Sequence, residues 1–247
     1  MRILAYTLGL FLIGALPCLC QTPLIDQQWG GLFTLRQSDN GDTFSVGAVC
    51  SDQSNIYVYD LAGDKVIRFD ASGKLAKIIK LEHIGHDTYS GDDFVVKDNE
   101  FIFLNTIDKR LDFFSTATGA HLRTLNFPVN FLAEEKKRSR MIITRIFVDN
   151  GTVYIGNEHV AVSIETTLAK KSATKKTLNM SNIKRIALVS GGRMFTTTGS
   201  MINVPGHSSS SIPKTHYPIQ GKRFVLLNDQ VFALTLSHQG LKLIKIQ

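Results

Sequence analysis

The stretch that decides the fold is GAVCSDQSNIYVYD, residues 47–60: an apolar run, a short polar turn and a second apolar run. The same phrase returns as FVVKDNEFIFLN at residues 94–105 and as RIFVDNGTVYIGN at residues 145–157. Weaker copies are ALVSGGRMFTT at residues 187–197 and FVLLNDQVFAL at residues 224–234. Two short apolar runs joined by a few Asp, Asn, Ser or Gly residues are typical of a β-hairpin. The chain therefore repeats one hairpin about five times.

The copies recur at a regular spacing. Their anchor positions lie 47, 52, 41 and 37 residues apart, at Val49, Val96, Val148, Val189 and Leu226. A repeating unit of about 40 to 50 residues made of short strands is the signature of a β-propeller blade. We therefore expect an all-β protein, a β-propeller in which each copy of the phrase begins one blade.

The first two copies continue far enough to supply a whole blade. The first is followed by KVIRFD, a turn and LAKIIKL, over residues 65–81. The second is followed by RLDFFS, a turn and HLRTLNF, over residues 110–127. The turn glycines Gly73 and Gly119 are 46 residues apart, so the two copies match almost residue for residue. Each continuation predicts the third and fourth strands of a blade.

This blade pattern resembles the NHL-type and related six-bladed propeller repeats. The residues that carry the resemblance are NIYVYD at 55–60 and FDASGK at 69–74. It is strong over residues 47–127, fair over residues 145–168 and thin beyond. The resemblance implies a blade and not an activity, because that superfamily includes enzymes, lectins, receptors and scaffolds.

The last copy offers only three strands where a blade needs four, at residues 224–227, 231–236 and 241–246. We expect a strand near the N-terminus, GLFTLR at residues 31–36, to complete that blade, because the pairing would remove two open sheet edges together. Residues 21–247 hold five blades of about 45 residues, whereas six blades would leave about 38 residues for each. Five blades are favoured, and six are the alternative.

The first 20 residues predict a secretory signal peptide. Met1 and Arg2 give a positive start, and the apolar stretch at residues 3–16 is too short to span a bilayer comfortably. Cleavage after Cys20 would leave residues 21–247 as one propeller domain, secreted or periplasmic, with no transmembrane segment. The alternatives are a membrane anchor formed by an uncleaved signal or by a lipidated cysteine.

Cys50 would then be the single cysteine of the exported domain. Alternation along its strand predicts a partly exposed side chain. No basic residue adjoins Cys50 in the sequence to lower its pKa, so we expect an unreactive thiol.

The chain is basic, with a formal net charge of +7. This excess favours anionic surfaces, and export argues against nucleic acid among them. Two clusters could form a positive binding patch if they share a face: Lys136, Lys137, Arg138 and Arg140 form the first, and Lys170, Lys171, Lys175 and Lys176 form the second. The expected partner is a protein or an acidic extracellular polymer, with no cofactor. The oligomeric state is left open.

Titratable residues raise a second hypothesis, an active site at the mouth of the propeller channel. A divalent metal could be held by His83, His86 and Asp87 if their loop curls. A hydrolase or lyase site could be assembled from Asp60, His86, Asp92 and Asp108. Asp92 and Asp93 cannot both serve one site, because neighbouring residues on a strand point to opposite faces.

Several motifs that would favour an enzyme do not occur. The sequence has no HExxH, no paired CxxC and no acidic calcium-binding loop. The run GHSSSSIPKTHYP at residues 206–218 is predicted to be a loop, and its serines lack the GxSxG motif that positions a nucleophile. The sequence therefore favours a binding or scaffold module, with the hydrolase or lyase as the alternative.

Overall fold

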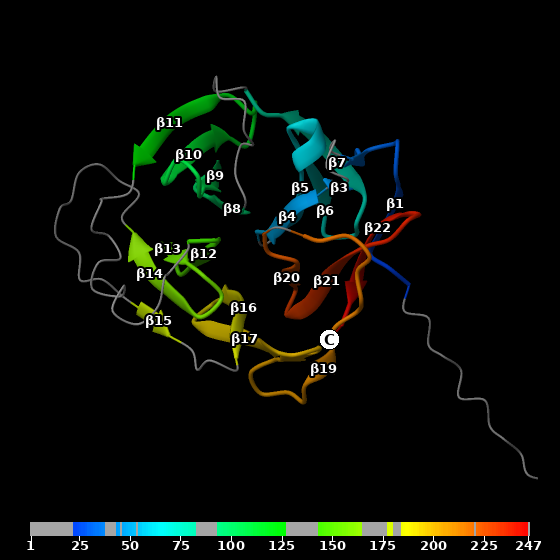
Figure 1. Ribbon diagram of the computed structural model, residues 1–247, viewed down its shortest axis with the longest axis vertical. Coiled ribbons are helices and arrows are strands. Elements are labelled where there is room, and N and C mark those ends of the chain that lie inside the picture. Colours follow the sequence, from blue (N-terminus) through cyan, green and yellow to red (C-terminus); the bar gives the residue numbers. More distant parts are fainter. Residues whose placement is uncertain are drawn as a thin grey trace, which may run out of the picture.

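Figure 1 presents the computed structural model of the chain, in which twisted sheets surround a central axis. The structure describes residues 22–37, 43–44, 46–52, 54–82, 93–126, 143–164, 177–179, 184–219 and 221–246. Five sheets of four antiparallel strands form the ring. The protein is a five-bladed β-propeller, as the repeat spacing predicts.

Four blades are meanders of consecutive strands, the fifth takes its outer strand from the N-terminal part of the chain, and in each blade the strands follow one another outward from the axis (Figure 1). Blade 1 consists of β4 (Val46–Ser51), β5 (Asn55–Asp60), β6 (Lys65–Asp70) and β7 (Leu75–Lys80). Blade 2 consists of β8 (Asp93–Lys97), β9 (Glu100–Asn105), β10 (Arg110–Ser115) and β11 (His121–Asn126). Blade 3 consists of β12 (Arg145–Asp149), β13 (Thr152–Gly156), β14 (Val160–Ile164) and β15 (Thr177–Asn179).

Blade 4 consists of β16 (Arg185–Ser190), β17 (Arg193–Thr198), β18 (Met201–Asn203) and β19 (Ser210–Ser211). Blade 5 consists of β20 (Phe224–Leu227), β21 (Gln230–Leu236), β22 (Gly240–Lys245) and, from the other end of the chain, β1 (Ile25–Gln28). A small two-stranded sheet, β2 (Arg36–Gln37) with β3 (Thr43–Phe44), and one 3-10 turn, η1 (Leu61–Gly63), complete the described elements.

The five anchor positions of the repeat lie on the innermost strands β4, β8, β12, β16 and β20. These strands contact one another in sequence order, and β20 contacts β4, so the ring is closed. The repeat found in the sequence is therefore the inner hairpin of each blade.

Left-handed turns explain why the repeat is rich in Asn, Asp and Gly. In four blades the inner strand turns back through two residues that both have positive φ, the geometry of a type I′ turn. This turn matches the twist of a hairpin, and Asn, Asp and Gly adopt it most readily. The four pairs are Asp98 and Asn99, Asn150 and Gly151, Gly191 and Gly192, and Asn228 and Asp229.

Blade 5 is closed by an N-terminal strand, as expected, but not by the expected segment. Strand β1 pairs with β22, with Ile25 opposite Leu243, whereas GLFTLR at residues 31–36 does not pair with blade 5 in its place. Only one residue of β1, Ile25, is buried, so its sequence carries little strand signal. Phe33, in the expected segment, is buried without belonging to a blade strand and packs in the same cluster as Ile25.

A second expectation needs correction at the outer edge of blade 4. Residues 206–218 were expected to form a loop throughout, but Ser210–Ser211 forms strand β19 and pairs with Met201 and Ile202 of β18. Serine has no strong strand preference, and this outermost strand needs only a short stretch of backbone to complete the sheet. The serine run is thus part of a blade.

Apolar side chains fill the spaces between neighbouring blades. Tyr59 of blade 1 lies edge-on to Phe103 of blade 2, with ring centroids 4.9 Å apart, and Phe94 stacks on Phe103 at 5.0 Å. Aromatic pairs at these separations are favourable beyond the area that they bury. These contacts fix blade 1 against blade 2.

The two repeat glycines mark another contact between blades. A Cβ atom on Gly119, in the β10–β11 hairpin, would lie 1.8 Å from the carbonyl oxygen of Lys80 in blade 1. A Cβ atom on Gly73 would lie 2.0 Å from the carbonyl oxygen of Leu24, beside the outer strand of blade 5. Both glycines also have positive φ. The repeated Gly is therefore the point where one blade touches the outer strand of the blade before it.

Within the described part of the chain, no helix has the length and apolar character needed to cross a membrane.

Candidate functional site

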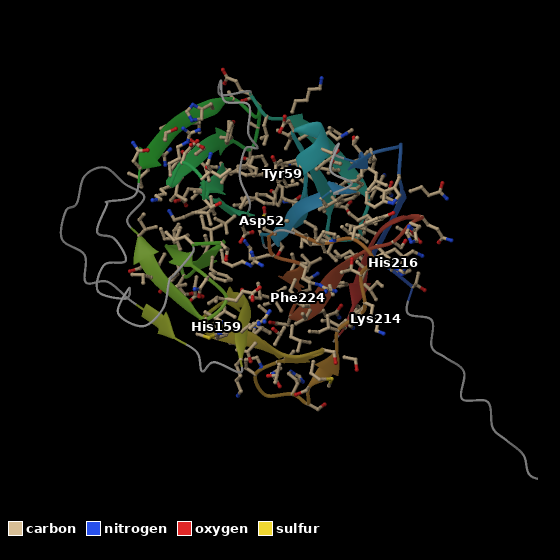
Figure 2. The ribbon with its side chains drawn as sticks, viewed as in Figure 1. Asp52, Tyr59, His159, Lys214, His216 and Phe224 are labelled. Atoms are coloured by element: carbon tan, nitrogen blue, oxygen red, sulfur yellow. The ribbon has the colours of Figure 1, made fainter. Side chains whose placement is uncertain are left out.

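A cavity of about 690 Å³ lies at the centre of the ring. Residues of all five inner strands line it, together with the turns that follow four of those strands. In Figure 2, Asp52 and Phe224 are labelled near the middle of the ring, whereas His216 lies farther out. The cavity therefore belongs to the propeller as a whole and not to any single blade.

Aliphatic side chains form part of the cavity wall. Val96, Val148, Leu188 and Leu226 come from four different blades, line the cavity and remain partly exposed. Side chains of this kind bind apolar groups by removing them from water. Polar residues of the turns, together with Lys222, form much of the rest of the lining, so the cavity offers a ligand both apolar contact and polar groups.

A buried ion pair closes one end of the cavity. Lys222, two residues before β20, places its Nζ 2.7 Å from Oδ1 of Asp93, the first residue of β8. The same ammonium group donates to the carbonyl oxygens of Phe94 and Ile146, each at 2.7 Å. The Lys222 side chain is 5% exposed and that of Asp93 is 0% exposed. We call this group of residues the floor.

The floor is fully hydrogen-bonded. An ammonium group has three N–H bonds, and Lys222 directs them to three oxygens. The Asp93 carboxylate also accepts from three backbone N–H groups, those of Phe94, Ile146 and Lys222. The backbone carbonyl of Lys222 in turn accepts from the N–H of Val49 in blade 1. The floor thus joins blades 1, 2, 3 and 5.

The opposite end is surrounded by the turns that follow the inner strands, which we call the rim. Asp149 Oδ1 accepts from Gly192 N at 2.8 Å and joins blade 3 to blade 4. Arg193 Nη2 lies 2.6 Å from Asp229 Oδ1 and joins blade 4 to blade 5. Ser51 Oγ donates to the carbonyl of Leu226 at 2.8 Å and joins blade 1 to blade 5. These contacts hold the rim in one shape.

Asp52 stands at the rim in blade 1, where the turn is longer than in the other blades. Its carboxylate accepts from Ser54 N, Asn55 N and the Tyr57 hydroxyl, each at 2.7 Å. Burial raises the pKa of Asp52, but these hydrogen bonds together outweigh burial and bring the pKa below its ordinary value. Asp52 therefore keeps its negative charge in mildly acidic solution.

The charges that line the cavity do not cancel. Lys222 is paired with Asp93, and Arg193 is paired with Asp229. Asp52 and Asp149 line the same cavity, and neither forms a salt bridge with any residue that the structure describes. The rim therefore carries an uncompensated negative charge in a protein that is basic as a whole.

Cys50 lies within the cavity wall, on β4. The side chain is 6% exposed, so the expected partial exposure is wrong. Both faces of an inner strand are covered by neighbouring blades, which alternation along one strand does not reveal. Burial raises the pKa of the Cys50 thiol well above its ordinary value, and the nearby Lys222 opposes this only in part. The thiol is protonated at neutral pH.

Two of the predicted catalytic residues lie in the described part of the chain, and neither lines the cavity. Asp60 ends β5 and is fully buried, and its Oδ2 accepts from Thr34 N at 3.3 Å and lies 3.2 Å from Lys65 Nζ. Burial raises the pKa of Asp60. Asp108 lies in the turn before β10, 3.4 Å from Arg110. The two carboxylates have separate sets of partners.

The other predicted site residues lie outside the described residues. These are His86 and Asp92 of the catalytic set, His83, His86 and Asp87 of the metal set, and Lys136, Lys137, Arg138, Arg140, Lys170, Lys171, Lys175 and Lys176 of the basic clusters. Among the residues that are described, no three His, Cys, Asp or Glu side chains are grouped to hold a metal ion.

Sequence reasoning missed the buried cation of the site. Lys222 precedes β20 in a short basic pair with Arg223, which reads in the sequence as the solvated start of a strand. Asp93 lies 129 residues earlier, so only the closed ring brings the two together. The equivalent positions of the other copies, Ser45, Asp92, Thr144 and Arg185, are polar too, so no signal in the repeat marks Lys222.

No protein-family profile matches the chain, and no curated protein is significantly similar to it. Among solved structures, a streptogramin B lyase aligns with a TM-score of 0.39 and 15% identity, over 87% of this chain and 73% of that chain. A glutaminyl cyclase from Myxococcus xanthus aligns at 0.42 and 10%, over 81% and 71%. The WD40 repeats of RRP9 align at 0.40 and 14%, over 85% and 62%.

Proposed function

We propose that this chain is an exported binding module that receives a group of its partner in the central cavity, through the rim. The observation that carries the proposal is the set of aliphatic side chains that four blades contribute and leave partly exposed around a cavity of about 690 Å³. A folded protein gains nothing from leaving such surface open, whereas an apolar ligand gains from covering it.

Binding is better supported than catalysis. The Cys50 thiol is held protonated by burial and is a poor nucleophile. The amine of Lys222 has all three N–H bonds engaged, and the Asp93 carboxylate accepts from four donors. Groups that are fully hydrogen-bonded hold a structure in place and are not free to move a proton. A hydrolase or lyase is the second candidate, and two of the four residues predicted for it, His86 and Asp92, lie outside the described part of the chain.

The expected partners can be ranked by the charge of the rim. An acidic polymer is repelled by the uncompensated carboxylates of Asp52 and Asp149. A protein partner suits this face better, and an acidic polymer would have to bind elsewhere, at the lysine and arginine clusters. The N-terminal sequence supports export, and the pattern of the first two blades supports an NHL-type repeat.

A ligand screen with a blocked cavity tests the proposal. Leu188→Trp places a large ring on the cavity wall, and Ile107→Trp places the same ring on a turn where Ile107 is 67% exposed. We expect small apolar compounds to raise the unfolding temperature of the wild type and of Ile107→Trp, but not of Leu188→Trp. Val148→Phe serves as a second, smaller block if Leu188→Trp does not fold. Compounds that stabilise the blocked and open proteins equally would contradict a cavity site.

A further inference from the structure

We infer that the cavity selects an apolar group that carries a protonated amine, bound with its apolar part inward and its ammonium group at the rim. This inference rests on the proposed function and names the ligand class of the same cavity. It depends on three observations: the aliphatic walls, the charge balance of the rim and the identity of the floor.

The aliphatic part of the wall favours an apolar ligand over a bare ion. Val96, Val148, Leu188 and Leu226 offer no ligand atoms, and the described residues hold no metal-binding group. Each CH₂ group that moves from water to such a surface gains about fourfold in affinity. The walls therefore select a molecule with an apolar chain of several carbons.

The charge balance of the rim selects a cation. Every cation in the lining already has a carboxylate partner, Lys222 with Asp93 and Arg193 with Asp229. Asp52 and Asp149 are left as carboxylates whose described partners are neutral hydrogen-bond donors. Only Oδ1 of Asp149 has a described partner, the N–H of Gly192, so its second oxygen can accept from a ligand. An ammonium group is the complementary charge.

The floor sets the orientation of the bound ligand in the cavity. The innermost charged group is the Lys222 ammonium, which would repel a second ammonium group placed beside it. A lysine side chain entering from the rim would carry its charge past the aliphatic walls toward Lys222. A molecule that enters with its apolar end first leaves its ammonium group beside Asp149. Two sources share this chemistry, a free alkylamine and the N-terminal apolar residue of a peptide.

Calorimetric titration with three six-carbon probes tests the inference. Hexylamine is protonated at pH 7, hexanol is neutral and hexanoate is an anion of similar length. We expect hexylamine to bind about tenfold more tightly than hexanol, and hexanoate to bind more weakly than hexanol. A peptide that begins with a free amino-terminal leucine should bind better than its acetylated form, and better than a peptide with an internal lysine. Hexylamine represents the free alkylamine and the peptides represent the amino-terminal residue, so the two sources are tested separately.

A charge variant and its control assign the preference to the rim. Asp149→Asn keeps an oxygen that can accept from Gly192 N–H but removes the charge. The variant should reduce the advantage of hexylamine over hexanol about fivefold and leave hexanol unchanged. Asp26→Asn, on the outer strand of blade 5, removes an exposed carboxylate that does not line the cavity and should change neither ligand.

The cavity as a binding site and its selection of an apolar amine can each be contradicted without the other. Equal binding of hexylamine and hexanol, tighter binding of hexanoate or no binding of any probe overturns the inference. The proposed function is decided independently, by whether ligands from the wider screen lose their effect when Leu188→Trp fills the cavity. Tighter binding of the lysine peptide than of the free amino-terminal peptide overturns the orientation, and with it the inference.

Discussion

The floor and the rim are opposite ends of one cavity, and they use charged residues in opposite ways. At the floor, Lys222 and Asp93 are buried and directly paired, and their hydrogen-bonding groups are engaged. At the rim, Arg193 and Asp229 are paired but exposed, while Asp52 and Asp149 have no cationic partner among the described residues. Charges that satisfy one another hold the ring together, whereas charges left uncompensated at an opening are available to a ligand.

Removing the lysine of the floor should have the largest effect. Lys222→Met leaves the Asp93 carboxylate buried without its cation, which costs about 3 to 5 kcal/mol of unfolding free energy. The double variant Asp93→Asn with Lys222→Met should recover part of that loss, because the isolated charge is gone. Urea denaturation followed by tryptophan fluorescence measures both. A loss below about 1 kcal/mol for Lys222→Met would mean that the floor does not lock the blades.

The thiol of Cys50 offers a measure of access to the cavity. Its raised pKa and burial predict that iodoacetamide labels it at least about a hundred times more slowly at pH 8 than in the unfolded chain. The measurement uses Cys18→Ser with Cys20→Ser, which leaves Cys50 as the single thiol. Mass spectrometry follows the rate. Labelling as fast as in the unfolded chain would place Cys50 at the surface.

Asp60 is a buried carboxylate outside the cavity, and it contrasts with Asp93. Because burial raises the pKa of Asp60 in the folded protein, the native state binds a proton that the unfolded state has released. The stability of the wild type should therefore fall as the pH rises above about 4, relative to Asp60→Asn, until the pH passes the folded pKa. Unfolding free energies of both proteins between pH 3 and pH 8 measure this difference. A constant difference across that range would contradict the raised pKa.

The smallest effect is expected at the rim. Arg193→Ala breaks an ion pair whose side chains are 43% and 81% exposed, so it should change stability by less than about 1 kcal/mol. Asp149→Asn should change stability as little, while it weakens amine binding. Rim variants that destabilise the protein as much as Lys222→Met does would remove the distinction between the two ends.

The blades were more predictable than the site. The repeat fixes each inner hairpin, because type I′ turns require Asn, Asp or Gly at adjacent positions and so leave a mark in the sequence. The repeat glycines are visible for the same reason, since Gly73 and Gly119 each touch a neighbouring blade. Strand β1 escaped prediction because its pairing with β22 needs only backbone groups and one apolar side chain, Ile25.

The site depends on contacts that no local pattern records. Lys222 and Asp93 meet only when the ring closes, and Cys50 becomes buried only when blades cover both faces of β4. Asp60 and Asp108 belong to separate hydrogen-bonding groups in blades 1 and 2, away from the cavity.

The most direct test of the cavity as a binding site is methyl NMR of the protein during titration with hexylamine. The account predicts that the methyl signals of Val96, Val148, Leu188 and Leu226 shift together with one dissociation constant. The signals of Leu75 and Ile78, exposed on the outer strand β7, should stay in place. Shifts confined to the outer strands, with the four cavity residues unchanged, would contradict the account.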